Sequence, residues 1–199
     1  MKIILSLLLL ISTSSFAGDI YMGLNHSTIT TGVANGASAS IPINQLTVGY
    51  EVSKYLDIEA STMVGNSNAG VAAASLPVNK LGGPFSVLPN SALAQVNFTA
   101  TVTGNSNVFA KPKFSYGDFT LFGKVGISKM SGSLHGSAVY SGRSVWDETR
   151  NYSASGRAYG YGAAMKITED MEISIDYTKY PKIEGYPVTS TGISAKYIF

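Results

Sequence analysis

Acidic and basic side chains recur at every second position in several segments of this chain. Glu172 and Asp176 share one face of such a segment. Ile173 and Ile175 occupy the opposite face, because side chains alternate between the two sides of a β-strand. If the charged faces enclose an interior, the acids and bases must pair there, since unpaired buried charges are costly. The charged positions that would form this interior network are Glu51, Glu59, Lys111, Lys113, Lys124, Lys166, Glu172, Asp176 and Lys196.

A second group of residues that could take part in binding lies between residues 131 and 156. This stretch contains Arg143 and Arg150, and the remaining arginine, Arg157, follows it directly. Arginine with aromatic side chains is the mixture found in binding hot spots and in phosphate recognition. The stretch is therefore a candidate surface-binding loop. It would either contact phosphate groups that surround it or bind a specific surface receptor. Its candidate residues are Tyr140, Arg143, Trp146, Arg150 and Tyr152.

Catalysis, metal binding and cofactor binding have little support in the sequence. The chain has two histidines and no cysteine, which excludes a disulfide framework and a thiolate metal site. It contains no phosphate-binding loop and no nucleophile elbow, so we expect no cofactor, no metal and no catalytic residues. The formal net charge is only +2, which gives no reason to expect nucleic-acid binding.

The first residues have the pattern of a secretion signal. Lys2 precedes a short apolar run over residues 3–11, and Ser15 and Ala17 place small residues where signal peptidase cuts. The run is too short for a spanning helix, which needs about 20 residues. We expect residues 1–17 to be a signal peptide and residues 18–199 to form one exported domain.

Alternation of apolar and polar residues predicts an all-β chain with eight strands. The expected strands cover residues 19–25, 45–52, 56–64, 107–116, 119–129, 157–167, 171–179 and 192–199. The connections at residues 53–55, 117–118 and 168–170 are tight, whereas the others are long. The stretch 92–99 also alternates, either as an upward extension of the fourth strand or as part of a hairpin, so ten strands are the alternative.

Aromatic residues collect near both ends of the expected strands. Tyr116, Phe119 and Phe199 fall beside the tight turns, and Tyr159 and Tyr177 fall near the other ends. Two aromatic belts around an apolar outer band are typical of a transmembrane β-barrel. A soluble β-sandwich would leave the belts unexplained. We therefore predict an eight-stranded, antiparallel, up-and-down transmembrane barrel with short periplasmic turns and long extracellular loops.

The sequence resembles the small eight-stranded outer-membrane barrels of the opacity type and the OmpA type. The resemblance is carried by Val48-Gly49-Tyr50-Glu51, by Tyr116-Gly117-Asp118-Phe119 and by the Tyr197-Ile198-Phe199 end. It implies the outer membrane of a Gram-negative bacterium, with both termini in the periplasm and lipids and lipopolysaccharide around the wall. It further implies that the barrel-assembly machinery reads Tyr197 and Phe199 in the last strand.

The interior of an eight-stranded barrel is just wide enough for side chains to fill. The charged residues named above are therefore expected to plug the barrel, with a narrow porin-like channel as the alternative. The function that we predict is non-enzymatic: surface loops would mediate adhesion, colonisation or envelope interactions, with a host-surface or matrix ligand as partner. A second alternative follows from His135-Gly136-Ser137 and Glu148, which resemble the His-x-Ser of lipid A-modifying hydrolases.

Overall fold

A computed structural model describes residues 18–32, 37–65, 68–77, 93–141 and 143–199. The expected signal peptide, residues 1–17, lies outside these residues, as does the stretch 78–92. In the described part of the chain, no helix is long and apolar enough to cross a membrane. The described strands are β1 (Ile20–Gly32), β2 (Ser38–Ser53), β3 (Leu56–Val64), β4 (Asn68–Pro77), β5 (Leu93–Tyr116), β6 (Phe119–Tyr140), β7 (Arg143–Lys166), β8 (Met171–Ile183) and β9 (Tyr186–Ile198).

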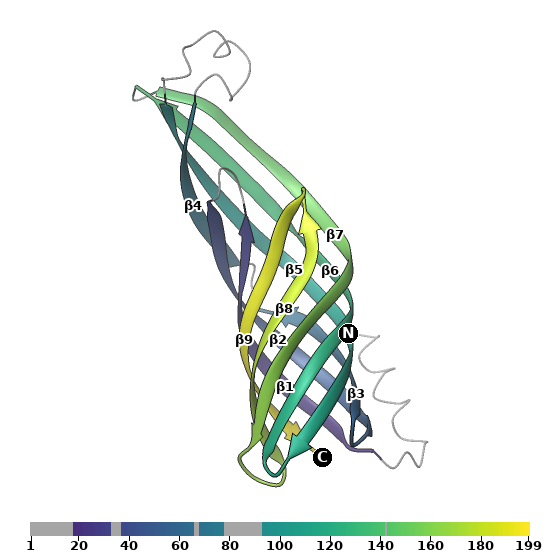
Figure 1. Cartoon of the computed structure of the whole chain (residues 1–199). Coiled ribbons are helices and arrows are strands. Elements are labelled where there is room, and N and C mark those ends of the chain that lie inside the picture. Colours follow the sequence, from purple (N-terminus) through teal and green to yellow (C-terminus); the bar gives the residue numbers. More distant parts are fainter. Residues whose placement is uncertain (1–17, 33–36, 66–67, 78–92, 142) are drawn as a thin grey trace.

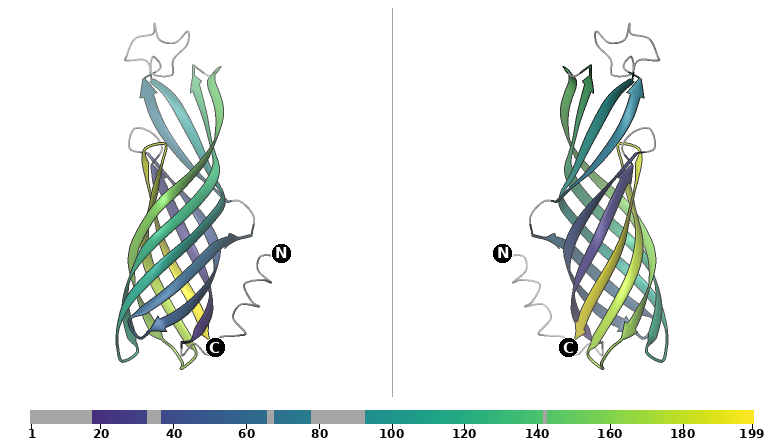
Figure 2. Two further views of the ribbon diagram at one scale, coloured as in Figure 1. Left: turned by 90° about the vertical axis from the view of Figure 1, so that its right-hand side faces the viewer. Right: turned by 90° about the vertical axis from the view of Figure 1, so that its left-hand side faces the viewer.

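Eight of these strands close into an antiparallel ring. Neighbours in the chain pair with one another from β5 to β9, β9 pairs with β1, and β1 pairs with β2 and β2 with β3. The ring is closed by β3 and the lower half of β5, with Leu56 opposite Pro112 and Thr62 opposite Ser106. The predicted up-and-down barrel of eight strands is thus confirmed, and its strands are strongly tilted (Figure 2).

The ten-strand alternative is wrong, although a ninth strand exists. β4 pairs with the upper half of β5, from Asn68 opposite Val102 to Pro77 opposite Leu93. β4 pairs with the same strand as β3 does, namely β5, but at a higher level. It therefore makes the barrel wall taller and does not add a strand to the closed ring. The alternating stretch 92–99 belongs, from Leu93 onward, to the upward extension of β5.

Seven of the eight predicted strands extend beyond their expected bounds or begin earlier at the end away from the tight turns, whereas β3 has its predicted bounds. Residues 131–156 were expected to be a loop, but they continue β6 and β7 to a tight turn at Ser141. β5, β6 and β7 have 24, 22 and 24 residues, whereas β1, β8 and β9 have 13 each. One side of the barrel therefore rises far above the other (Figure 1). We call β4 and the upper parts of β5 (93–102), β6 (130–140) and β7 (143–154) the tall wall.

In the lower barrel, the part nearest the tight turns, the outer face is apolar and the inner face is polar. Along β6, Leu121, Val125 and Ile127 are exposed on the outside, while Lys124 and Ser128 are buried inside. Of the aromatic residues predicted for the two belts, Tyr116, Phe119, Tyr159 and Phe199 are exposed, and Tyr177 is half-buried. Phe119 to Ile127 is about the length that a transmembrane strand needs, which is roughly 9–11 residues.

Above this band the polarity reverses. Lys129 follows Ile127 on the outer face of β6, and Met130 follows Ser128 on the inner face, where it is 2% exposed. The same change occurs on the inner face of β2, where the buried residue above Gln45, farther from the tight turn, is Ile43. The upper interior is a continuous apolar core of Ile29, Ala39, Ile41, Ile43, Ala94, Val96, Phe98, Ala100, Val102, Met130, Ala138, Tyr180, Ile183 and Val188. This core reaches down to Ala158 and to Phe109, which lies opposite Glu59 in the register.

Candidate functional site

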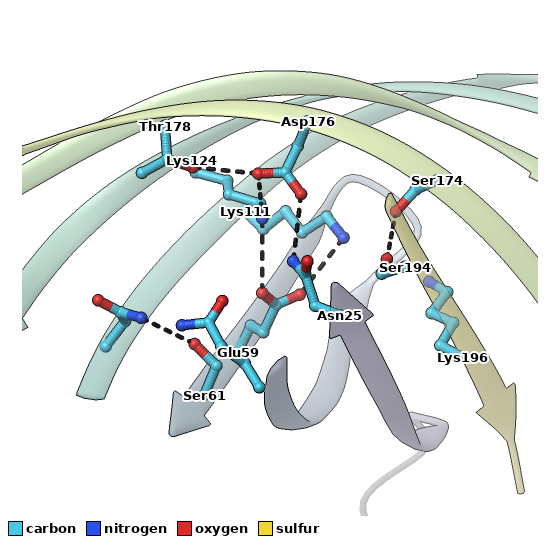
Figure 3. A network of polar contacts seen from close by, with 12 residues as sticks. Asn25, Glu59, Ser61, Lys111, Lys124, Ser174, Asp176, Thr178, Ser194 and Lys196 are labelled. Atoms are coloured by element: carbon cyan, nitrogen blue, oxygen red, sulfur yellow. Dashed lines mark hydrogen bonds and ion pairs between the residues drawn. The ribbon is translucent and has the colours of Figure 1, made fainter. Parts of the chain in front are cut away.

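The lower interior is organised around one carboxylate, that of Glu59 on β3. Its Oε2 lies 3.4 Å from Lys111 Nζ and accepts a hydrogen bond of 3.2 Å from the hydroxyl of Tyr21. Its Oε1 lies 3.8 Å from Lys124 Nζ. Both lysines are buried, so Glu59 is the charge that balances two ammonium groups inside the barrel (Figure 3).

The opposite wall supplies a second carboxylate to this network. Asp176 on β8 lies 3.2 Å from Lys124 Nζ, and so Lys124 joins β8 to β3 across the interior. Thr178 donates a hydrogen bond to Asp176 at 3.1 Å, and the Asn25 amide donates to it at 3.5 Å. The result is a lateral tie between strands that are far apart in the chain (Figure 3).

Two further ion-paired groups lie nearer the tight turns. Lys113 Nζ is 2.7 Å from both Glu51 and Asp57. Lys196 Nζ is 2.9 Å from Glu172, its register partner on β8. Lys113–Asp57 and Lys196–Glu172 join neighbouring strands, whereas Glu51 lies on β2, one strand beyond β3. Together these pairs extend the charge network toward the turn end.

Aromatic rings complete the filling of the lower interior. Lys111 Nζ lies 4.0 Å from the centre of the Phe122 ring, and Lys196 Nζ lies 4.4 Å from that of Tyr21. Such cation–π contacts are attractive because the face of an aromatic ring carries negative charge density. A cavity of only about 10 Å³ remains beside Glu59 and Lys111, which is about the space of a single water molecule. The arrangement is a packed plug.

The structure brings together eight of the nine predicted interior charges. The exception is Lys166, whose side chain is exposed at the turn end of β7. Asp57 was missed, although it shares the alternating face of Glu59 and could have been found from that spacing. Tyr21 was missed because alternation alone does not say which face of β1 points inward.

The hydrolase residues do not converge. His135 is on the outer face of β6, where its Nδ1 lies 3.0 Å from Thr149 Oγ1 and 3.8 Å from Asp147. Glu148 lies on the other face of the hairpin, with its carboxylate turned to Trp146 and Arg150. Within the described ranges, no group of three or more His, Cys, Asp and Glu side chains could hold a metal ion.

Three of the five candidate loop residues, Trp146, Arg150 and Tyr152, line a pocket at the mouth of the barrel. Trp146 and Tyr152 lie on the inner face of β7, and Arg150 stands at the rim with its side chain 66% exposed. Tyr140 packs against the upper apolar core near the top of β6, and Arg143 is the first residue of β7. The pocket has a volume of about 370 Å³. Its lining residues are Thr31, Gly32, Phe98, Ala100, Leu134, Gly136, Trp146, Glu148, Arg150, Tyr152, Ile183, Glu184 and Tyr186.

Two glycines of β6 make room for the large rings of β7. A Cβ atom at Gly136 would overlap the Trp146 ring, and one at Gly132 would overlap the Tyr152 ring. Trp146 also packs edge-on against Phe98, with ring centres 6.3 Å apart. The aromatic positions are therefore fixed by backbone neighbours as well as by side chains.

The polar groups of this pocket are bound to one another. Glu148 accepts hydrogen bonds from Trp146 Nε1 at 3.3 Å and from Arg150 Nε at 2.7 Å. The Arg150 guanidinium lowers the pKa of Glu148 below its ordinary value. The Tyr152 hydroxyl donates to the Thr101 carbonyl oxygen at 2.9 Å, and burial raises the pKa of Tyr152 to about 12.

A row of basic side chains marks the outer wall just above the apolar band. Lys129, Arg157 and Lys179 project outward from the consecutive strands β6, β7 and β8. Arg157 lies opposite Ile127 in the register, and Lys179 lies opposite Tyr159. The Lys179 ammonium is 5.7 Å from the centre of the Tyr159 ring. Aromatic and basic residues thus meet where the outer surface changes from apolar to polar.

Comparison with known proteins gives one family and a set of solved barrels. Residues 3–199 match the family described as "Outer membrane protein beta-barrel domain". No curated protein sequence matches the chain at a significant level.

Three solved structures illustrate the likeness. The chain is similar to Ail, the attachment invasion locus protein of Yersinia pestis (18% identity, 92% of this chain and 97% of that chain, TM-score 0.51). It is also similar to the outer membrane protein OprG of Pseudomonas aeruginosa (11% identity, 92% and 97%, TM-score 0.52). Neisserial surface protein A is similar as well (10% identity, 90% and 97%, TM-score 0.50). At these identities the likeness establishes the barrel fold.

Proposed function

The chain belongs to the outer-membrane β-barrel family, and on this premise we propose that it is a non-enzymatic surface protein that binds through its tall wall. The observation that carries the proposal is the reversal of polarity between Ile127 and Lys129. A wall with a polar outside and an apolar core is built for water, so it belongs above the bilayer. Binding, in adhesion or in contacts within the envelope, is the role that such a platform can serve.

The packed interior supports binding over conduction. Lys111, Lys124 and Glu59 close the lower barrel, and above them side chains such as Ile41, Val96 and Val188 are fully buried. Ions would have to displace both a paired charge network and an apolar core. This favours the predicted plug over the alternative of a narrow channel.

We infer the orientation from the position of the tight turns. Outer-membrane barrels have short periplasmic turns and rise toward the cell exterior. The strand ends at Ile20 and Ile198 lie at the same end as the turns, so both termini would be periplasmic. The row of Lys129, Arg157 and Lys179 would then lie at the level of the lipopolysaccharide phosphates, which suits their charge.

The name of one structural neighbour points in the same direction. Ail is an attachment invasion locus protein, and its barrel covers almost all of this chain. For the present protein, a host-surface or matrix ligand remains the kind of partner that we propose. The upper hairpin of β6 and β7, between Ser137 and Asp147, is the part of the tall wall that would stand farthest from the membrane.

The test is a hairpin truncation that preserves the register. Ser137 pairs with Asp147, so replacing residues 138–146 with a two-residue Asn-Gly turn shortens the hairpin without shifting the strands below. Cells with this variant should lose binding to immobilised matrix proteins and host cells while retaining wild-type amounts of heat-modifiable barrel. Lys129→Gln, outside the hairpin tip, is the matched control and should retain binding.

Undiminished binding by the truncated variant would contradict the proposed role of the tall wall. Discrete conductance of the wild-type protein in planar bilayers would favour the channel instead. A changed lipid A mass on overexpression, lost with His135→Ala, would favour the hydrolase.

A further inference from the structure

We propose that the pocket at the mouth of the barrel is a binding site for a compact, uncharged apolar molecule. The candidate is independent of adhesion, because it concerns the inner face of the tall wall and not its tip. The volume of about 370 Å³ lies within the range of small-molecule sites, roughly 300–1,000 Å³.

The pocket exists because the barrel has walls of unequal height. Its tall side consists of Phe98 and Ala100 on β5, Leu134 on β6 and Trp146 on β7. Its low side consists of the top of β1 at Thr31 and the tight turn between β8 and β9 around Glu184. The tall wall extends past this turn (Figure 1), so a ligand would be held between the two and enter from above.

The inner surface offers apolar contacts to a ligand. Phe98, Leu134 and Ile183 present aromatic and aliphatic surface, and Trp146 and Tyr152 add the faces of two large rings. The polar ends of these two rings are already bound, Trp146 Nε1 to Glu148 and the Tyr152 hydroxyl to the Thr101 carbonyl. A ligand with several polar groups would therefore find few partners here.

The charges at the rim favour neither an anion nor a cation. The Arg150 guanidinium is flanked by Glu148, at 2.7 Å, and Glu184 also belongs to the pocket lining. An anion would meet two carboxylates, and a cation would meet the guanidinium. An uncharged molecule avoids both conflicts and gains from leaving water, at about 25 cal/mol for each Å² of apolar surface buried.

The chain contains a built-in reporter for this site. Trp146 is the single tryptophan of the sequence, so tryptophan emission reports on the pocket alone. The probes are three molecules that share one compact hydrocarbon cage and do not absorb where tryptophan is excited: 1-adamantanol, 1-adamantanecarboxylate and 1-adamantylammonium. They are titrated into the folded protein in lipid nanodiscs.

Neighbouring threonines on β1 provide a matched pair of variants. Thr31 is 7% exposed and lines the pocket, so Thr31→Phe should fill it. Thr30 faces outward, within 3.5 Å of the Ser40 hydroxyl, so Thr30→Phe adds the same ring on the outside of the wall. Heat-modifiable mobility shows whether each variant folds, and Ala100→Leu replaces Thr31→Phe if the latter does not.

We expect a saturable change of Trp146 emission with 1-adamantanol, and about tenfold weaker binding of both charged analogues. Thr31→Phe should weaken the binding of 1-adamantanol about tenfold, which is a loss of about 1.4 kcal/mol, and Thr30→Phe should change it less than about twofold. A response that never saturates, or one that Thr31→Phe leaves intact, would overturn the site. Tighter binding of either charged analogue would overturn its assignment to an uncharged ligand.

Discussion

The lower barrel and the tall wall share the three strands β5, β6 and β7, yet their faces have opposite polarity. In the lower barrel Ile175 faces outward, 61% exposed, while Glu59 and Lys124 are buried inside. In the tall wall Asn97 faces outward and Val96 is fully buried. A lipid solvent accounts for the first arrangement and water for the second. A continuous β-strand thus passes from lipid into water. The level of the boundary is the point at which its outward side chains change from apolar to polar.

The comparison also distinguishes two kinds of ion pair. Glu59 holds Lys111 and Lys124 where water has little access, so loss of its carboxylate leaves Lys111 without its ion partner and Lys124 with Asp176 alone. Glu148 pairs with Arg150 at the exposed rim, where solvent screens both charges. The two carboxylates should therefore differ greatly in what their removal costs.

The largest expected effect is that of Glu59→Ala. Breaking a buried ion pair typically costs about 3–5 kcal/mol, because a charge is left uncompensated. The free energy of unfolding, measured by urea titration in lipid vesicles, should fall by about this amount. Glu148→Ala is the control and should leave the unfolding midpoint nearly unchanged. Equal, small effects of the two substitutions would contradict the buried network.

The next effect concerns the outer surface. A lysine on the lipid face near the middle of the membrane costs roughly 2–4 kcal/mol. Ile175→Lys should therefore impair folding into vesicles strongly, whereas Asn97→Lys, on the outer face of the tall wall, should fold like the wild type. The fraction of heat-modifiable protein measures both. A barrel that tolerates Ile175→Lys would not have this face in lipid.

A smaller effect is expected from the last residue. Phe199 is exposed on the outside of the turn end and packs edge-on against Tyr197, with ring centres 5.1 Å apart. We expect that the assembly machinery reads this aromatic end, so deletion of Phe199 should lower the amount of folded barrel in the outer membrane. Deletion should affect refolding in vitro much less, which separates assembly from stability. Normal outer-membrane levels would contradict the prediction.

The smallest effect is a pH response at the rim. Arg150 lowers the pKa of Glu148, so the folded hairpin is favoured above the ordinary carboxyl pKa and loses this contribution as the pH falls through the lowered one. Protonation weakens the contact of Glu148 with Trp146, and the emission of Trp146 should change in this acidic range. In Arg150→Gln the midpoint should move to higher pH. An unchanged midpoint would show that the pair does not form in solution.

The sequence predicts the lower barrel well because apolar outside and charged inside is a strong period-two signal. The tight turns at Gly117 and between Ile167 and Met171 were found for the same reason. The signal fails in the tall wall, where outward residues such as Asn151 and Ser153 are polar and resemble those of a loop. The upper parts of β6 and β7 are strands because they pair with each other. Local composition does not predict which segments of a chain will pair.

The candidate site shows the same division. On β8, Glu172, Ser174 and Asp176 alternate with apolar residues, and this pattern correctly predicted that the two acids face inward. The same reasoning would have identified Asp57. The pocket could not be predicted from the sequence, because Phe98, Leu134 and Ile183 come from three segments whose approach depends on unequal strand heights. Trp146 and Arg150 were found by residue type, but as members of a surface loop, whereas they belong to the strand β7 of the tall wall.

Probe accessibility along the outer face of β6 is the measurement that examines the polarity reversal between Ile127 and Lys129 without intermediaries. The chain has no cysteine, so single cysteines can be placed at outward positions such as Val125, Ile127, Lys129 and Ser133 and spin-labelled in lipid vesicles. Oxygen concentrates in lipid, so it should reach the spin labels at positions 125 and 127. A water-soluble nickel complex should reach the labels at position 129 and above. Oxygen-dominated labels at positions 129 and 133, or water-exposed labels at positions 125 and 127, would contradict the polarity reversal.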